Sequence, residues 1–400
     1  MPGPHSVSIP SGCIGTLAGN GELGHSGDSK PAVEACLNEP KGLALGAGAL
    51  YIADAENHVI RRVDLATGII TTVAGYPEKG NGSSGPALAV MPKEDEDPFA
   101  DPSPSTAQKF VQTTDLSGTV RYIVGQGKAG RFGGDGGPAT KATLNFPGAV
   151  AVDRHGHLYI ADTMNHRVRR VDAKTGVITT IAGTGQHRYS GDGGLATAAA
   201  LNEPAALAVD GKNQLYIADQ SNNRVRKVDL TTGIITTVAG TGDSGYTGDG
   251  VPAVEAGLSG PSGLTLGPDD TLYIADTFAG RIRKIDASGI ISTVVGDGSE
   301  YRFSGMANEF STSLSRPYGI ALDAEDNLLI TDSDSHLLRR WYKKKKIIAR
   351  LAGSGQAQFG GDGGNPLAGS LNYPFGVVVD GAGNVYIADT FNHRIRMIAA

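Results

Sequence analysis

The sequence predicts an all-β protein, a closed β-propeller made of four-stranded antiparallel blades. Two repeated patterns indicate this fold. The motif Tyr-Ile-Ala-Asp, once as Leu-Ile-Thr-Asp, returns along the chain, and a β-branched run ending in Ala-Gly or Val-Gly returns in step with it. Composition agrees, since 58 Gly and 20 Pro among 400 residues favour many short strands joined by turns. A repeat of roughly 57 residues is typical of solenoids, propellers or arrays.

The spacing of the two markers predicts the number of blades. The final Asp of the first motif steps by 108, 57, 57, 56 and 57 residues, so one step is nearly double. The second marker places a short unit inside that double step. We therefore predict seven blades with a degenerate second blade, and the alternative is six blades with residues 76–123 as an excursion from the ring. The first marker ends at Asp54, Asp162, Asp219, Asp276, Asp332 and Asp389. The Ala-Gly or Val-Gly pairs of the second marker begin at Ala18, Ala74, Val124, Ala182, Ala239, Val295 and Ala352.

One unit, residues 196–240, shows the pattern of a blade. Predicted strands start at Pro204, Leu215, Arg224 and Ile234, and Gly, Asp and Asn turns separate them. The second and fourth runs are apolar throughout, so both faces of the sheet must be covered. Like sheets arranged around an axis cover each other on both faces, which is the architecture of a propeller.

The two ends of the chain predict how the ring closes. Residues 14–19 form a fourth strand with no first three before it, and the last unit, residues 375–399, has three strands and stops. We expect the N-terminal strand to complete the last blade, with residues 1–400 forming a single domain.

Long Gly-Asp-Gly-Gly loops connect the units. Their glycines allow positive φ without strain, and we expect the Ala-rich segment after them to form one helical turn. The loop aspartates could suggest calcium, but EF-hand spacing is absent and turns use Asp beside Gly, so a structural role is favoured. The Asp of Tyr-Ile-Ala-Asp pairs with an arginine of the next strand in our interpretation, such as Asp162 with Arg167 or Arg169.

The turns after Tyr-Ile-Ala-Asp carry a family resemblance. Asn165-His166-Arg167 and Asn392-His393-Arg394 resemble the NHL repeat, and the resemblance covers nearly the whole chain. It implies a propeller, commonly of six blades. The acidic, proline-rich residues 86–109 depart from that pattern. Propeller lyases that amidate peptides are similar in fold and use a histidine-held metal, but no residue here matches their site.

We expect the ligand site at one end of the ring. In a four-stranded blade, the loop between units and the loop between strands two and three open on the same face, and ligands of closed β rings sit in the mouth. The residue before the proline of Leu-Asn-x-Pro, here called the pre-proline position, varies while its neighbours repeat. Ordinary variation at a solvated rim is the alternative. The position holds Glu39, Phe146, Glu203, Gly260, Arg316 and Tyr373.

The Asn-His turns supply candidate metal ligands. Neutral histidine is the commonest metal ligand, so a divalent metal is one expectation. The alternative is that each imidazole makes a hydrogen bond within its own turn, because the same residue recurs in separate blades. The candidates are His58, His166, His336 and His393.

These features leave two hypotheses about function. The first is a module that binds a protein, glycan or small polar ligand on the face with the Gly-Asp-Gly-Gly and Asn-His loops. The second is a stand-alone lyase or hydrolase with its site in the channel mouth, where two carboxylates could divide acid and base roles. Lysines 343–346, beside the chain's one Trp, could meet an acidic partner on the opposite face or be a solvated turn.

The net charge, the length of the apolar runs and the two cysteines bear on nucleic-acid binding, membrane insertion and disulfide formation. A net charge of −6 argues against nucleic-acid binding, and no apolar run approaches the roughly 18 residues of a membrane span. No signal peptide is visible, the compartment is undetermined, and we expect a monomer. Cys13 and Cys36 can form one disulfide or remain two free thiols.

Overall fold

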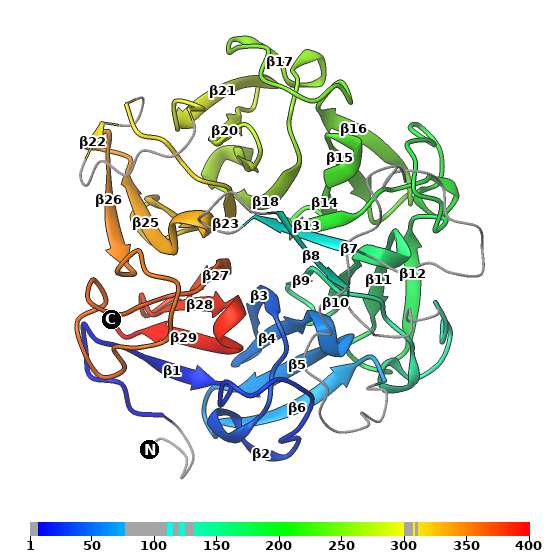
Figure 1. Ribbon diagram of the computed structural model, residues 1–400. Helices are drawn as coiled ribbons and strands as arrows, with labels where there is room; N and C mark the ends of the chain where they lie inside the picture. Colours follow the sequence, from blue (N-terminus) through cyan, green and yellow to red (C-terminus); the bar gives the residue numbers. More distant parts are fainter. Residues whose placement is uncertain (1–6, 77–109, 115–119, 125–131, 300–306, 309–310) are drawn as a thin grey trace. The chain divides into compact units, whose positions relative to one another are not determined.

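The computed structural model describes residues 7–76, 110–114, 120–124, 132–299, 307–308 and 311–400. The chain divides into two compact units, one formed by Met1–Glu78 with Arg131–Ala400 and the other by Lys79–Gly130. In the first unit, six sheets of antiparallel strands surround a central axis (Figure 1). The helical elements of the described residues are short 3₁₀ turns. The predicted all-β propeller is confirmed.

Each blade begins with its innermost strand, and the chain then moves outward. Blade 1 contains β3 (Pro40–Gly46), β4 (Ala49–Asp54), β5 (Val59–Asp64) and β6 (Ile69–Ala74). Blade 2 contains β9 (Ala149–Val152), β10 (Leu158–Asp162), β11 (Arg167–Val171) and β12 (Ile178–Ala182). Blade 3 contains β13 (Pro204–Val209), β14 (Gln214–Asp219), β15 (Arg224–Asp229) and β16 (Ile235–Ala239).

The other half of the ring follows the same order. Blade 4 contains β18 (Pro261–Leu266), β19 (Leu272–Asp276), β20 (Arg281–Ile285) and β21 (Ile290–Val295). Blade 5 contains β23 (Pro317–Leu322), β24 (Leu328–Asp332), β25 (Leu337–Tyr342) and β26 (Ile347–Ala352). Blade 6 contains β27 (Pro374–Val379), β28 (Val385–Asp389), β29 (Arg394–Ile398) and, as its outer strand, β1 (Ile14–Ala18).

The ring closes by pairing the first strand with the last. β1 runs antiparallel to β29, with Ile14 opposite Ile398 and Ala18 opposite Ile395 (Figure 1, blue beside red). Both strands bury apolar residues, and Ile14 and Ile395 are inaccessible to solvent. The predicted closure by the N-terminal strand is confirmed.

The predicted count of seven blades is not confirmed, and the six-blade alternative matches. The inner strands of blades 1 and 2 touch directly, since a Cβ built on Gly42 would lie 2.5 Å from Cα of Ala149. Within the predicted degenerate blade, β7 (Phe110–Thr114) and β8 (Val120–Val124) pair only with each other. The rest of that segment lies outside the described residues. A blade of this ring starts from an inner strand, and the sequence of this segment lacks the first half of a unit.

Short additions extend the blades at their outer edges. The strands β2 (Lys30–Pro31), β17 (Val251–Pro252) and β22 (Ala307–Asn308) pair with the outer strands of blades 1, 4 and 5.

The Ala-rich segments form 3₁₀ turns as predicted, with a buried alanine at the start of each. These turns are η1 (Ala32–Glu34), η3 (Ala139–Lys141), η5 (Ala196–Ala198) and η7 (Ala253–Glu255).

Glycines let the inner strands approach closely around the axis. A Cβ on Gly263 would lie 2.0 Å from the carbonyl oxygen of Tyr318, and one on Gly319 would lie 2.1 Å from that of Phe375. Only a hydrogen fits at such distances. The inner strands therefore pack backbone against backbone, and the side chains next to these glycines decide what lies at the channel.

Cys13 and Cys36 are both free and half-buried. The disulfide alternative is therefore not formed in this structure.

Candidate functional site

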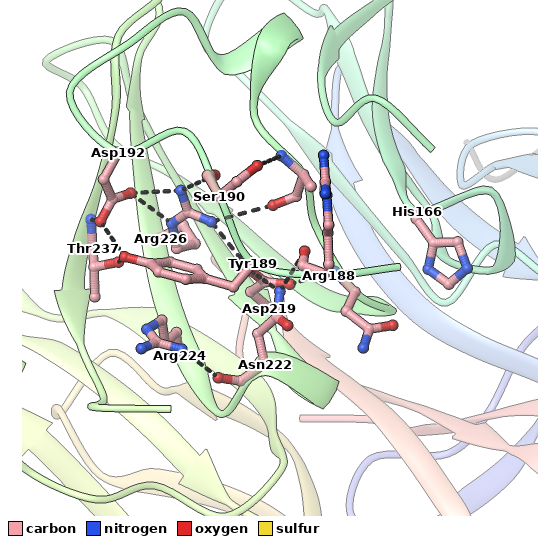
Figure 2. A network of polar contacts seen from close by, with 12 residues as sticks. His166, Arg188, Tyr189, Ser190, Asp192, Asp219, Asn222, Arg224, Arg226 and Thr237 are labelled. Carbon is pink, nitrogen blue, oxygen red and sulfur yellow. Dashed lines mark hydrogen bonds and ion pairs between the residues drawn. The ribbon is translucent and has the colours of Figure 1, made fainter. Parts of the chain in front are cut away.

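One fully buried arginine organises each blade and holds the loop that leads to the mouth. In blade 3, Nη1 of Arg226 lies 3.3 Å from Oδ2 of Asp219 and Nη2 lies 2.5 Å from Oδ1 of Asp192 (Figure 2). Asp192 belongs to the Gly-Asp-Gly-Gly loop, so the loop aspartate serves as an arginine acceptor. The equivalent arginines have no exposed surface in any blade: Arg61, Arg169, Arg226, Arg283, Arg339 and Arg396. In blade 2 the partner of Asp162 is Arg169 at 3.2 Å, whereas Arg167 donates to the carbonyl of Thr184.

The same aspartate anchors the segment that carries the candidate site. Oδ1 of Asp219 accepts the backbone N–H of Asn202 at 2.7 Å, and Oδ2 accepts from the side chain of Asn222 at 2.9 Å. Burial raises the pKa of Asp219 to about 6, while these hydrogen bonds and the charge of Arg226 oppose that shift. Because Asn202 precedes Glu203, the buried pair sets the position of the pre-proline residue.

Blade 4 lacks one donor of this network, which predicts a stabilising substitution. Ala279 replaces the asparagine found in blade 3, and Asp276 and Arg283 lie 3.6 Å apart. Within the described residues, Oδ2 of Asp276 and Nη1 of Arg283 are buried without a hydrogen-bond partner. We expect Ala279→Asn to raise the free energy of unfolding by about 1 kcal/mol, measured by chemical denaturation. Ala287→Asn, in an exposed turn, is the control, and an equal effect of both substitutions would refute this interpretation.

The histidines of the Asn-His turns join neighbouring blades. Nδ1 of His166, in blade 2, accepts the backbone N–H of Glu203 in blade 3 at 3.2 Å. Oδ1 of Asn223, in blade 3, accepts the backbone N–H of Gly260, in blade 4, at 2.9 Å. Each of these imidazoles therefore accepts a hydrogen bond from the next blade, a partner that the predicted hydrogen bond within the turn did not include. The other pairs are His393 with Glu39 at 3.2 Å, His58 with Phe146 at 3.0 Å and His336 with Tyr373 at 3.2 Å.

This geometry favours neutral imidazoles. Nδ1 must keep its lone pair to accept a backbone N–H, and burial lowers the pKa of His336 and lowers that of His393 to about 4. The four candidate metal ligands each serve a separate blade junction. In the part of the chain that the structure describes, no three His, Cys, Asp or Glu side chains gather as a metal site. Metal binding by these histidines stays a prediction.

A cavity of about 210 Å³ lies where the inner strands meet at this end of the ring. Two pre-proline residues, Phe146 and Glu203, line it. The guanidinium of Arg316 instead pairs with Asp334, with Nε 3.4 Å from Oδ2. Residues directly after the prolines form much of the wall, and most are small or aromatic. They are Lys41, Gly148, Ala205, Ser262, Tyr318 and Phe375.

The two remaining pre-proline candidates lie outside the cavity wall. The ring of Tyr373 packs between His336, at 4.6 Å between centroids, and Phe391, at 5.0 Å. Glu39 donates its backbone N–H to His393, and burial raises the pKa of its carboxyl, opposed by the charge of Lys41. The variable pre-proline positions thus surround the cavity, and a subset faces it.

Lys41 is the cavity residue that the sequence analysis missed. Its Nζ lies 4.2 Å from the ring centroid of Phe146 and 5.0 Å from that of Phe375. Burial lowers the pKa of Lys41, and the negative charges of Glu39, Glu56 and Glu203 oppose the shift. Burial, followed by the charge of Glu39, raises the pKa of Glu56 to about 7. The variation at the position after each proline was the signal that could have identified Lys41.

Blade 3 also departs from the repeat at the cavity. In four blades a hydroxyl directly after the buried aspartate donates to the proline carbonyl of the next blade. Gln220 occupies that position in blade 3 and lines the cavity, as does Tyr318. Next to it, the hydroxyl of Ser221 donates to Oε2 of Glu203 at 2.8 Å. The hydroxyl pairs are Thr163 with Pro204, Thr277 with Pro317, Ser333 with Pro374 and Thr390 with Pro40.

Comparison with known families gives matches in three stretches. The teneurin NHL domain matches residues 107–190 and 241–309, and the NHL repeat matches residues 371–396. Protein SUPPRESSOR OF QUENCHING 1 of Arabidopsis thaliana is 30% identical over 288 residues, which cover 69% of this chain and 27% of that protein. Human NHL repeat-containing protein 2 is 30% identical over 292 residues, covering 63% and 39%. The chain thus spans less than half the length of these curated relatives.

Solved structures share the fold at low sequence identity. A Bacteroides thetaiotaomicron protein of unknown function superposes with a TM-score of 0.62 and 17% identity, covering 96% of this chain and 74% of that one. An auxiliary nutrient binding protein from the same organism gives 0.60 and 14%, covering 96% and 75%. Among the described residues, no helix is long and apolar enough to cross a membrane. The recurring Asn-His turns, the six blades and the matched repeats show that the chain belongs to the NHL-repeat β-propeller family.

Proposed function

We propose that this propeller binds a small polar ligand in the cavity at the end of the ring that carries the Gly-Asp-Gly-Gly and Asn-His loops. The observation that carries the proposal is the break in symmetry at the cavity wall. A scaffold that repeats six times places different side chains there, including Lys41, Glu203 and Tyr318. Propellers host unrelated functions through such grafted positions, so the site and not the fold supports the proposal. Binding is also what NHL propellers mediate as a family.

The size of the cavity favours a small ligand over a protein or glycan chain. A volume of about 210 Å³ lies below the roughly 300–1,000 Å³ of pockets that hold drug-sized ligands. A ligand with the dimensions of a monosaccharide or an amino acid suits this space. The wall offers an amine, a carboxylate, a phenol and phenyl rings, which together can orient a polar molecule with an apolar side.

A ligand screen with matched variants tests this proposal. Monosaccharides, free amino acids and short-chain carbonyl compounds are added singly, and the thermal midpoint of unfolding is followed. We expect at least one compound to raise the midpoint of the unsubstituted protein, and Glu203→Gln to weaken its binding by about tenfold, corresponding to the loss of one hydrogen bond to a charged group. Glu255→Gln, on an exposed outer turn, should bind as the unsubstituted protein does. Absence of any stabilising compound, or equal binding by both variants, would refute the ligand site.

The second candidate is an enzyme, and Glu56 is the observation that favours it. A carboxyl with a pKa of about 7 can donate and accept a proton at neutral pH, as a general acid-base in a lyase or hydrolase does. The screened ligand decides between the two functions. Its recovery unchanged after incubation, analysed by mass spectrometry, would exclude turnover. Metal analysis of the purified protein tests the metal-dependent form of this alternative.

A further inference from the structure

Lys41 is unusual among the lysines of this protein. Its Nζ contacts the faces of Phe146 and Phe375, and within the described residues it forms no ion pair and no hydrogen bond. By contrast, Nζ of Lys212 lies 2.6 Å from a carboxylate oxygen of Asp270 at the surface. A half-buried ammonium without an acceptor loses hydration that the protein does not replace, and this favours the neutral amine. The direction of the pKa of Lys41, lowered by burial, agrees.

A neutral lysine in an apolar pocket is the form that attacks carbonyl compounds. The wall around Lys41 is open enough for such a compound, because Gly148, Ala205 and Ser262 occupy the corresponding positions of blades 2, 3 and 4. The rings of Phe146 and Phe375 can also stabilise a cationic nitrogen by cation–π attraction, whether it is an ammonium or a protonated imine. The pocket therefore accommodates the amine before and after such a reaction.

We propose that Lys41 captures a small aldehyde or ketone in the cavity as an imine, with water carrying the protons; the inference rests on the proposed ligand site. The Nζ lone pair attacks the carbonyl carbon, forming the C–N bond while the π pair moves to oxygen. Proton transfer gives a carbinolamine. The protonated hydroxyl then leaves as water with the C–O bonding pair, and the nitrogen lone pair forms the C=N bond. One water is released, and neither an oxidant nor a reductant takes part.

Reductive trapping tests the imine directly. The full chain is incubated at pH 7 with propanal and sodium cyanoborohydride, which converts an imine to a stable secondary amine. Peptide mass spectrometry then measures the alkylation rate of each lysine. We expect Lys41 to react several-fold faster than Lys174, an exposed lysine of the blade 2 turn, because a lowered pKa leaves a larger fraction of the amine neutral.

The outcomes distinguish failure of the imine proposal from failure of the ligand site on which it rests. Lys41→Met should remove the fast phase of alkylation seen in the intact mass. Alkylation of Lys41 no faster than that of Lys174 would overturn the imine. If screened ligands still bind in a manner that depends on Glu203, the ligand site survives that result.

Discussion

Arg226→Met is expected to lower the free energy of unfolding by about 3–5 kcal/mol, the usual cost of removing one partner from a buried ion pair. Methionine fills much of the space but leaves Asp219 buried with no opposing charge and Asp192 without its arginine. The same change should weaken ligand binding, because Asp219 positions Asn202 and thereby Glu203. Urea denaturation followed by circular dichroism measures the stability of the fold.

Two further variants test whether the loss of stability comes from removing the buried arginine. Lys227→Met, the next residue of the same strand, changes a half-exposed side chain and should cost less than about 1 kcal/mol. Asp219→Asn combined with Arg226→Met removes the stranded charge, so it should be more stable than Arg226→Met alone. If Arg226→Met does not fold, the double variant still measures the effect. A loss for Arg226→Met no greater than that for Lys227→Met would contradict the role of the buried arginine.

The blades could be predicted from the sequence because each one is encoded by local patterns. The buried aspartate ends its strand at a fixed place in the repeat, and residues 14–19 stand alone as an unpaired strand, so both the sheets and the closure follow. The number of blades could not be predicted in the same way. The run of residues 110–124 has the apolar pattern of two strands, but ring membership requires an inner strand that packs on its neighbours. That requirement concerns contacts between units, which a repeat marker does not report.

The candidate site was predictable only in part for the same reason. Variation within the repeat identified the pre-proline positions, two of which line the cavity. It could not tell that Phe146 and Glu203 face the cavity while Arg316 pairs with Asp334. Lys41 was missed because its significance comes from Phe146 and Phe375, which lie far away in sequence and belong to other blades. Similarly, the histidines were assigned to their own turns, although their partners lie in the following blade.

His393→Asn is expected to make the protein less sensitive to acid without weakening it at pH 7. Nδ1 of His393, in blade 6, accepts the N–H of Glu39, in blade 1, so this bond spans the closure of the ring. Asn223 makes the equivalent bond in blade 3, and asparagine tolerates the φ of 53° found at His393. His393→Ala loses the acceptor and should cost about 1–3 kcal/mol at any pH.

The direction of the pH effect follows from the lowered pKa of His393. Its pKa is about 4 in the folded chain, because of burial and then the charge of Arg394, against an ordinary value of 6.5. The unfolded chain therefore binds more protons between these values. The stabilisation is complete above about pH 6.5 and is lost as the pH falls towards 4. In the same range the buried aspartates act in the opposite direction, since burial raises the pKa of Asp389 to about 6.

The contribution of His393 is isolated by comparing His393→Asn with the unsubstituted protein. The pH curve of the unsubstituted protein alone does not isolate it. The aspartates are the same in both proteins, so the difference between their unfolding free energies reports residue 393 alone. We expect that difference to be within about 1 kcal/mol at pH 7 and to shift in favour of His393→Asn as the pH falls from 6.5 to 4. Urea unfolding at half-unit pH intervals measures it. Parallel curves for the two proteins would contradict this role of His393, because an imidazole that binds protons equally in the folded and unfolded chains contributes no pH dependence.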